Sequence, residues 1–274
     1  MKTFKPDIVF HAAAYKHVPM LEGNPKEAMR TNVYGTKILA DLSIRFGVRK
    51  FVMISTDKAV NPTSIMGASK RIAEMYIQSL SGEDNHKTHF VTTRFGNVLG
   101  SNGSVVERFK QQIEKGEAIT VTHPDVARYF MTIPEAVQLV LEASTMGRGG
   151  EIFVFDMGHM VKIKDLAAKM IRLSGLIPGE DIDIEYIGLR PGERLYEELL
   201  AEKENLLSTH HPKILKARVN SVSYSEIQNK FDKLYPVLHE IDKEEVVRYM
   251  KDIVPEFKSK NSVYESLDKE SIAQ

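Results

Sequence analysis

The sequence of 274 residues contains no cysteine. Disulfide bonds, thiolate metal ligands and a cysteine nucleophile are therefore excluded, and the composition fits a reducing compartment. The nine histidines are scattered without the spacing of a zinc-binding helix, so we expect no metal site. The 37 basic residues balance the 37 acidic ones, which argues against nucleic acid as a partner.

Long apolar runs are also missing. No stretch approaches the roughly 18 consecutive apolar residues that indicate a membrane-spanning helix, and residues 1–6 lead into a strand without a signal-peptide core. We therefore expect a soluble, cytoplasmic chain that makes no membrane contact of its own. Its length suffices for one large α/β domain, alone or with a small appendage.

Short apolar runs alternate with helix-like segments along the first 157 residues. Strands are expected at residues 7–14, 50–55, 89–95 and 151–156. Helices are expected at residues 26–46, 64–80, 105–115 and 136–143, the last of them after the capping box of Thr132 and Glu135. This alternation predicts an α/β fold of βαβ units, with a parallel sheet covered by helices on both faces.

Polar residues of chemical interest follow the second predicted strand. Ser55-Thr56-Asp57-Lys58 closes that strand, and Met66 and Lys70 lie one turn apart on the next helix. Open α/β sheets bind their ligands at the carboxyl ends of the strands. The layout resembles that of a dehydrogenase active site, with Met66 where a tyrosine is expected. A thioether has no ionisable proton, so Met66 cannot act as a base.

Five segments in a fixed order carry a resemblance to a known family. They are His11 to Pro19, Thr31 to Thr36, Ser55 to Pro62, Arg94 to Gly100 and Arg190 to Glu193. The set resembles the extended short-chain dehydrogenase/reductase superfamily and, within it, the polysaccharide-biosynthesis (CapD-like) UDP-N-acetylglucosamine 4,6-dehydratases. The resemblance runs from about residue 7 to about residue 216 and implies a Rossmann-like, doubly wound parallel sheet.

One feature of that family is missing from the sequence. Its members begin with a strand and a G-x-x-G-x-x-G turn, which sets a helix N-terminus against the dinucleotide pyrophosphate. Gly100-Ser101-Asn102-Gly103 cannot replace this turn, because it follows a late strand and lacks the third glycine. We therefore expect an N-terminally truncated fold that lacks its first βα units. Relatives with methionine at the tyrosine position are usually the cytoplasmic part of a larger inner-membrane protein.

The resemblance divides the chain into three parts. Residues 1–157 are expected to form a partial NAD(P)-binding Rossmann-like domain, and residues 158–216 a small substrate-binding lid. Residues 217–274 are expected to form a helical and polar C-terminal extension, with a solvated tail from Lys258. A homo-oligomer is expected, with the helix at residues 64–80 as a pairing surface.

The family's reaction implies roles for the residues of the second strand end. A hydride passes from the sugar C4 to NAD(P), water is lost from C5 and C6, and the hydride returns to C6. By resemblance, Thr56 steers the C4 oxygen, Asp57 protonates the departing C6 oxygen, and Lys58 removes the C5 proton. Lys58 can do so only if its pKa is depressed.

Met66 leaves the C4 hydroxyl proton without its usual acceptor. Two acceptors are considered, namely Thr56 with Asp57 as relay, and a water held by Lys70. Alternatively, Met66 merely fills space in an inactive enzyme.

The resemblance also assigns the cofactor contacts, with NAD favoured over NADP. These contacts are His11, Ala12, Ala13, Ser55, Lys70, Arg94 and Asn97. Lys70 is expected to hold the nicotinamide ribose, and the small alanines to allow close approach of the cofactor. His11 follows an apolar run, which favours a hydrogen-bonded core histidine over a catalytic one. Asn32 is expected to bond nearby backbone groups.

A UDP-sugar is the expected substrate. Its contacts are Lys16 near the sugar, Asn97 on the sugar-phosphate side, Arg190 on the diphosphate, Glu193 on the uridine ribose and Arg128 beside them. Two simpler interpretations stay open: Arg190 to Glu193 as a type II turn, and Arg128 as a surface charge.

Two further functions are compatible with the sequence. A nucleotide-sugar epimerase of the same superfamily would normally use the missing tyrosine and would not need the pair Asp57 and Lys58. A non-catalytic sugar-nucleotide-binding fragment is favoured by the missing glycine-rich turn.

Overall fold

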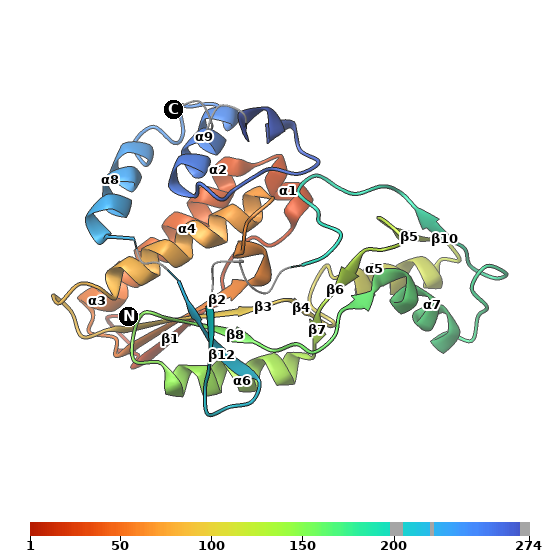
Figure 1. Cartoon of the computed structure of the whole chain (residues 1–274), viewed down its shortest axis with the longest axis horizontal. Coiled ribbons are helices and arrows are strands. Elements are labelled where there is room, and N and C mark those ends of the chain that lie inside the picture. The colour runs from red at the N-terminus through yellow and green to blue at the C-terminus, as the bar shows by residue number, and fades with distance from the viewer. Residues whose placement is uncertain (198–204, 220–221, 269–274) are drawn as a thin grey trace.

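The computed structural model of the chain describes residues 1–197, 205–219 and 222–268. Its centre is a six-stranded sheet in the order β1-β2-β3-β8-β12-β11 (Figure 1). The strands are β1 (Ile8–His11), β2 (Lys50–Thr56), β3 (His89–Phe95), β8 (Glu151–Phe155), β12 (Ile214–Arg218) and β11 (Asn205–Ser208). The first four are parallel, whereas β12 runs antiparallel to β8 and pairs with β11 as a hairpin.

Helices cover both faces of this sheet, which confirms the predicted doubly wound α/β fold (Figure 1). One face carries α3 (Gly35–Arg45) and α4 (Ile65–Leu80), and the other carries α6 (Ile133–Met146). Side chains alternate along β2, so Phe51 and Met53 pack under α4 while Val52 packs with the residues of α6. Burial on both faces accounts for the unbroken apolar runs of these strands.

The predicted helix at residues 26–46 is not continuous. It consists of α2 (Pro25–Ala28), a π-helical turn (Met29–Tyr34) and α3. Asn32 lies in the π-helical turn, fully buried, where it donates to the backbone O of Tyr15 and to Ser69 Oγ and accepts from the backbone N of Tyr15. The structural role expected for Asn32 is confirmed. The turn fixes the loop that follows β1 against α4.

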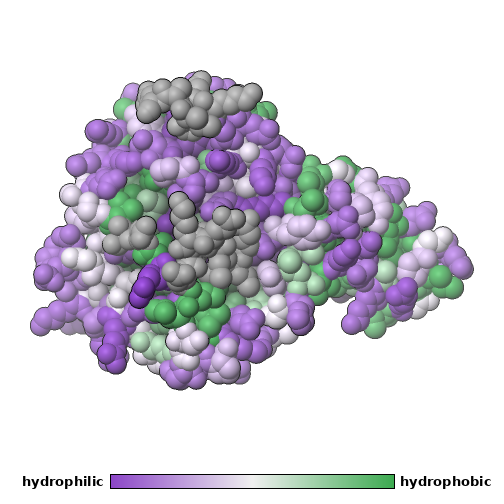
Figure 2. All heavy atoms as spheres, viewed as in Figure 1, coloured by the Kyte–Doolittle hydropathy of each residue, from purple (hydrophilic) through white to green (hydrophobic). Residues whose placement is uncertain are grey.

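A second lobe projects from the sheet (Figures 1 and 2). It contains α5 (Val105–Glu114), β5 (Ile119–Val121), α7 (Ile163–Leu173) and β10 (Ile184–Tyr186). Phe109, Val121 and Ile171 belong to its separate hydrophobic core. Short pairs join the lobe to the sheet layer, namely β4 (Asn97–Val98) with β7 (Phe130–Met131), and β6 (Ala127–Arg128) with β9 (Val161–Lys162).

The lobe changes the expected division of the chain. The helix at residues 105–115 forms but packs with α7 and β5 rather than on the sheet, so its assignment to the sheet layer was wrong. Conversely, β11 and the start of β12 lie in the central sheet although residues 158–216 were expected to form a lid. Residues 198–204 of that range lie outside the described residues.

The C-terminal extension packs against α4. It contains α8 (Tyr224–Leu234), α9 (Lys243–Ile253) and a 3₁₀ turn (Val263–Asp268), and Phe231, Met250 and Tyr264 join the core under α4. The helix at residues 64–80 therefore does not offer the expected pairing surface, because 14 of its residues are buried within this chain. The segment from Lys258 to Asp268 is anchored by the buried Ser259, Tyr264 and Leu267, while six of its eleven residues are exposed, as expected of a solvated tail. Residues 269–274 lie outside the described residues.

No helix in the described residues is long and apolar enough to span a membrane. No group of three or more histidine, aspartate or glutamate side chains in that part of the chain is arranged to hold a metal ion.

Candidate active site

A cavity of about 570 Å³ opens between the carboxyl edge of the sheet and the second lobe. Eleven of the residues predicted from the sequence line it together. These are Ala12, Lys16, Ser55, Thr56, Lys58, Met66, Lys70, Asn97, Arg128, Arg190 and Glu193. Four others, His11, Ala13, Asp57 and Arg94, are not among the lining residues.

The predicted catalytic turn, residues 56–59, begins where β2 ends. Thr56 Oγ1 accepts a hydrogen bond from the backbone N of Lys58 (3.4 Å) and donates one to Asp57 Oδ1 (2.8 Å), which fixes the 3₁₀ turn Asp57–Ala59. The next helix, α4, begins after Ser64, whose Oγ accepts from the backbone N of Gly67. A Cβ on Gly67 would lie 2.2 Å from the carbonyl O of Lys58. The absence of a side chain at Gly67 therefore lets α4 lie directly against the catalytic turn.

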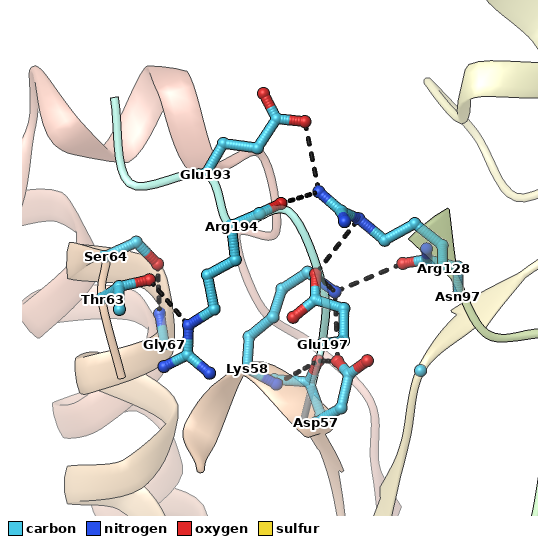
Figure 3. A network of polar contacts seen from close by, with 12 residues as sticks. Asp57, Lys58, Thr63, Ser64, Gly67, Asn97, Arg128, Glu193, Arg194 and Glu197 are labelled. Carbon is cyan, nitrogen blue, oxygen red and sulfur yellow. Dashed lines mark hydrogen bonds and ion pairs between the residues drawn. The ribbon is translucent and has the colours of Figure 1, made fainter. Parts of the chain in front are cut away.

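Lys58 lies at the centre of a charged network (Figure 3). Its Nζ is 3.1 Å from Asp57 Oδ1, 3.1 Å from Glu197 Oε1 and 3.3 Å from Asn97 Oδ1. Glu197 Oε1 is also 3.2 Å from Arg128 Nε. The side chains of Asp57 and Glu197 are 0% and 3% exposed, so both carboxylates meet Lys58 in a largely dry environment.

The network decides the protonation tendencies of its members. Burial alone would lower the pKa of Lys58, but Asp57 and Glu197 together raise it. Burial, reinforced by Glu197, raises the pKa of Asp57 despite the attraction of Lys58. The pKa of Glu197 is lowered, because Lys58 and Arg128 outweigh its burial. The expectation that the pKa of Lys58 is depressed is therefore wrong. The raised pKa of Asp57, in contrast, favours the protonated form of its carboxyl group.

Lys70 and Met66 lie side by side in the cavity wall. Lys70 Nζ donates to the carbonyl O of Ile54 (2.7 Å), and burial lowers its pKa to about 8 against the opposing effect of Glu74. Met66 is 4% exposed and belongs to the core under α4 as well as to the cavity lining. The depressed pKa that was expected at Lys58 is thus found at Lys70.

Two of the residues predicted to contact the cofactor serve the core instead. Arg94 is 1% exposed, and its guanidinium binds Glu74 through two bonds, Nε to Oε1 (2.9 Å) and Nη2 to Oε2 (2.7 Å). His11 Nε2 lies 2.8 Å from Thr36 Oγ1, and burial, helped by Lys70, lowers the pKa of His11 to about 4. The sequence favours a hydrogen-bonded core histidine at position 11, and this geometry fits that interpretation.

The predicted substrate turn, Arg190 to Glu193, forms one wall of the cavity. Glu193 Oε2 accepts from the backbone N of Arg190 (3.1 Å), and Oε1 accepts from Thr122 Oγ1 (2.9 Å) and lies 3.2 Å from Arg128 Nη2. Arg128 also donates to the carbonyl oxygens of Ala127, Leu195 and Arg194. The simple interpretation of Arg128 as a surface charge is wrong, since it is buried and braces the substrate turn.

Glu197 and Arg108 are among the cavity-lining residues that were not predicted from the sequence. Glu197 lies in a charged stretch that reads as solvent-exposed, and its partners Lys58 and Arg128 are distant in the chain. Arg108 lines the cavity from α5, and its Nε is buried without a hydrogen-bond partner in the described part of the chain. Burial, followed by the nearby charge of Arg190, lowers the pKa of Arg108. No sequence pattern distinguishes either residue from a surface charge.

Gly67→Ala tests the close approach of α4 to the catalytic turn. The added Cβ forces the backbone apart, so we expect a loss of about 1–3 kcal/mol of unfolding free energy, measured by urea denaturation. Gly23→Ala is the matched control, because its Cβ would lie 3.6 Å from the nearest backbone oxygen, an ordinary contact. Equal stability of the two variants would contradict the tight packing.

Comparison with known proteins relates this site to a family. Residues 1–219 match the family described as "Polysaccharide biosynthesis protein". The chain is 59% identical over 227 residues to the capsular polysaccharide biosynthesis protein CapD of Staphylococcus aureus, an alignment that covers 83% of this chain and 38% of the relative. The chain therefore spans well under half the length of that relative.

Two further relatives differ in their named reactions. The chain is 37% identical over 204 residues to a UDP-N-acetylglucosamine 4,6-dehydratase (inverting) of Campylobacter jejuni, covering 74% of this chain and 58% of the relative. It is 39% identical over 199 residues to a UDP-glucose 4-epimerase of Rickettsia canadensis, covering 72% and 57%. Similarity alone therefore does not separate dehydratase from epimerase.

Solved structures show the same architecture. The X-ray structure of Pen from Bacillus thuringiensis superposes with a TM-score of 0.72 at 36% identity, covering 83% of this chain and 75% of that one. DesIV, a dTDP-glucose 4,6-dehydratase from Streptomyces venezuelae with NAD and TYD bound, superposes with a TM-score of 0.61 at 21% identity, covering 69% and 63%. The likeness to DesIV, at 21% identity, shows a shared fold.

Proposed function

Because the chain belongs to the polysaccharide-biosynthesis protein family, we propose that it is an NAD-dependent nucleotide-sugar 4,6-dehydratase. Its substrate is UDP-N-acetylglucosamine and its product a UDP-4-keto-6-deoxy sugar for bacterial surface polysaccharide or glycan synthesis in the cytoplasm. The observation that carries this proposal is the contact of Asp57, a buried carboxyl with a raised pKa, with the Lys58 cation beside the cavity. An acid and a cation in contact suit the removal of water from adjacent carbons.

The cavity fits the nicotinamide-ribose end of NAD. Lys70 has one acceptor in the described part of the chain, Ile54 O, which leaves two of its three N–H donors for ribose hydroxyls. Ala12 and Ser55 line the same wall of the cavity as Lys70, and their small side chains leave room beside Lys70. When bound, NAD supplies the hydride acceptor for C4 and the hydride donor for C6.

Asp57 is assigned the proton transfers at C5 and C6. Its carboxylate takes the C5 proton and, as a carboxyl with a raised pKa, returns that proton to the departing C6 oxygen as water leaves; C5 and C6 are neighbours. Lys58, held charged by two carboxylates, stabilises negative charge as the C5 proton leaves. Because Asp57 lies beneath the cavity floor, Lys58 or Glu197 must shift for the sugar to reach it.

The diphosphate is assigned to Arg190 and Arg108. The two guanidinium groups approach the cavity from the substrate turn and from α5, and their mutual repulsion is relieved by a dianionic ligand. Glu193 meets the uridine ribose, Asn97 the sugar-phosphate side and Lys16 the sugar.

An epimerase is the second candidate, supported by the relative from Rickettsia. It needs no acid at C6, so the buried position and raised pKa of Asp57 would serve no purpose in it. A non-catalytic binding fragment is the third candidate, and it would bind a UDP-sugar without forming product.

Incubation of the chain with NAD and UDP-N-acetylglucosamine tests these candidates together. We expect a product lighter by one water, detected by mass spectrometry. A product of unchanged mass with inverted C4 would instead identify an epimerase, and binding without product would identify a binding fragment.

Arg190→Ala is expected to weaken UDP binding about tenfold or more, measured by calorimetry; unchanged affinity would remove Arg190 from the site.

A further inference from the structure

The C-terminal strap, residues 258–262, crosses the outer side of the candidate active site. Its backbone pairs with the segment before α4, with Lys258 N donating to Pro62 O (3.1 Å) and Lys260 N to Thr63 O (3.2 Å). Its other side meets the substrate turn, where Gly192 N donates to Lys260 O at 2.7 Å. The strap therefore joins the start of α4 to the turn that carries Arg190 and Glu193.

Side chains reinforce these backbone contacts. Asn261 Nδ2 donates to the carbonyl O of Glu193 (3.4 Å), and Ser262 Oγ donates to Glu22 Oε2 (2.7 Å). Glu22 in turn accepts from the backbone N of Ile65, the first residue of α4 (2.8 Å). The strap thus reaches three elements of the site at once, namely the substrate turn, α1 (Val18–Glu22) and α4.

The turn has little room on its inner side. A Cβ on Gly192 would lie 2.6 Å from Ser64 Cβ and 3.0 Å from Glu22 Oε1. Thr63 Oγ1 donates to the carbonyl O of Gly192 (3.2 Å) and accepts from Arg194 Nε (3.0 Å). The turn is therefore held between α4 on one side and the strap on the other.

The strap is itself anchored at both ends. Lys251 of α9 donates to Ser259 Oγ (2.9 Å) and pairs with Asp268. Tyr264 and Leu267, beyond the strap, are buried in the core under α4. The strap lies beyond the family match, which ends at residue 219, so nothing in that match assigns it a role.

We propose that the C-terminal strap is a positioning element of the nucleotide-sugar site, in which Asn261 holds the substrate turn directly and Ser262 fixes Glu22 beside it, in the geometry that binds a nucleoside diphosphate. The choice of ligand rests on the proposed function, whereas the hold on the turn does not. The C-terminal extension thereby contributes to substrate affinity without touching the substrate.

The double variant Asn261→Gly with Ser262→Ala tests the proposal. Asn261 has a φ of +52°, which glycine adopts freely, so the backbone path is kept while both side-chain bonds are removed. A neutral hydrogen bond is worth a factor of about two to ten. We expect UDP affinity, measured by calorimetry, to fall about tenfold, and hydrogen exchange at the Gly192 amide to accelerate.

Ser266→Ala is the matched control, because Ser266 is exposed and bonds only locally, to Val263 O. It should leave both readouts unchanged, and exchange in β2 and β3 should stay slow in all variants. Unchanged UDP affinity together with unchanged exchange at Gly192 in the double variant would overturn the proposal. If the wild-type chain binds no UDP, the proposed function fails, and exchange at Gly192 alone decides the strap: faster exchange supports it and equal rates overturn it.

Discussion

Arg94→Met is expected to lower the free energy of unfolding by about 3–5 kcal/mol, measured by urea denaturation at neutral pH. Arg94 and Glu74 are both buried and joined by two short hydrogen bonds. Removing the guanidinium leaves the Glu74 carboxylate with Arg71 at 3.4 Å as its remaining cation contact in the described part of the chain. The cost comes from the carboxylate left behind in the core, because methionine fills much of the lost volume.

The deficit should depend on pH with a definite sign. In the wild type, burial would raise the pKa of Glu74, but Arg94 outweighs it and lowers the pKa below 4.5. This contribution to stability is therefore present above pH 4.5 and is lost as the pH falls through the lowered pKa. In the variant, the burial of Glu74 dominates and raises its pKa. The stability of the variant therefore falls as the pH increases. The difference between wild type and variant should consequently shrink toward pH 4 and grow toward pH 7.

A second variant separates charge from packing. Adding Glu74→Gln to Arg94→Met removes the unpaired charge at nearly constant shape, so part of the lost stability should return at pH 7. A deficit that is independent of pH and unaffected by Glu74→Gln would mean that Arg94 stabilises the fold through packing alone.

The elements of the sheet layer could be predicted closely. The strand at residues 89–95 and the helix that follows Ser64 form where the pattern places them, because buried parallel strands give short apolar runs and a capping serine marks a helix start. The lobe could not be predicted in this way. α5 looks like any amphipathic helix, and its place depends on the pairing of β5 with β10, about 65 residues further on.

Some residues of the candidate site could be predicted from the sequence, and others could not. Thr56, Lys58 and Asn97 converge as expected, because parallel strands end at one edge of the sheet. Arg94 lies on β3, but its side chain points into the core and binds Glu74 of α4, since side chains alternate between the two faces of the sheet. Glu197 was missed because a glutamate is seldom buried unless it is paired, and its partners are set by tertiary structure.

Asp57→Asn is expected to reduce formation of the dehydrated product about 10²- to 10⁴-fold, the range attributed to a positioned acid or base. The amide has nearly the shape of the carboxyl but neither takes nor delivers a proton. Affinity for UDP should stay within a few-fold of the wild type, because Asp57 is buried and is not among the residues that line the cavity. Product formation is measured by mass spectrometry and UDP affinity by calorimetry.

Solvent exchange at C5 decides which group moves the C5 proton. In heavy water the wild-type enzyme should place deuterium at C5 of the sugar, because C6 receives the hydride that NAD took from C4. If Asp57 serves both carbons, Asp57→Asn abolishes exchange at C5 together with product. If Lys58 were the base, as the resemblance implied, Asp57→Asn would still exchange the C5 proton while losing the C6 step. Because Asp57 and Glu197 hold Lys58 charged in this structure, we expect Asp57→Asn to lose both the exchange at C5 and the product. Exchange at C5 without product would instead identify Lys58 as the base that removes the C5 proton.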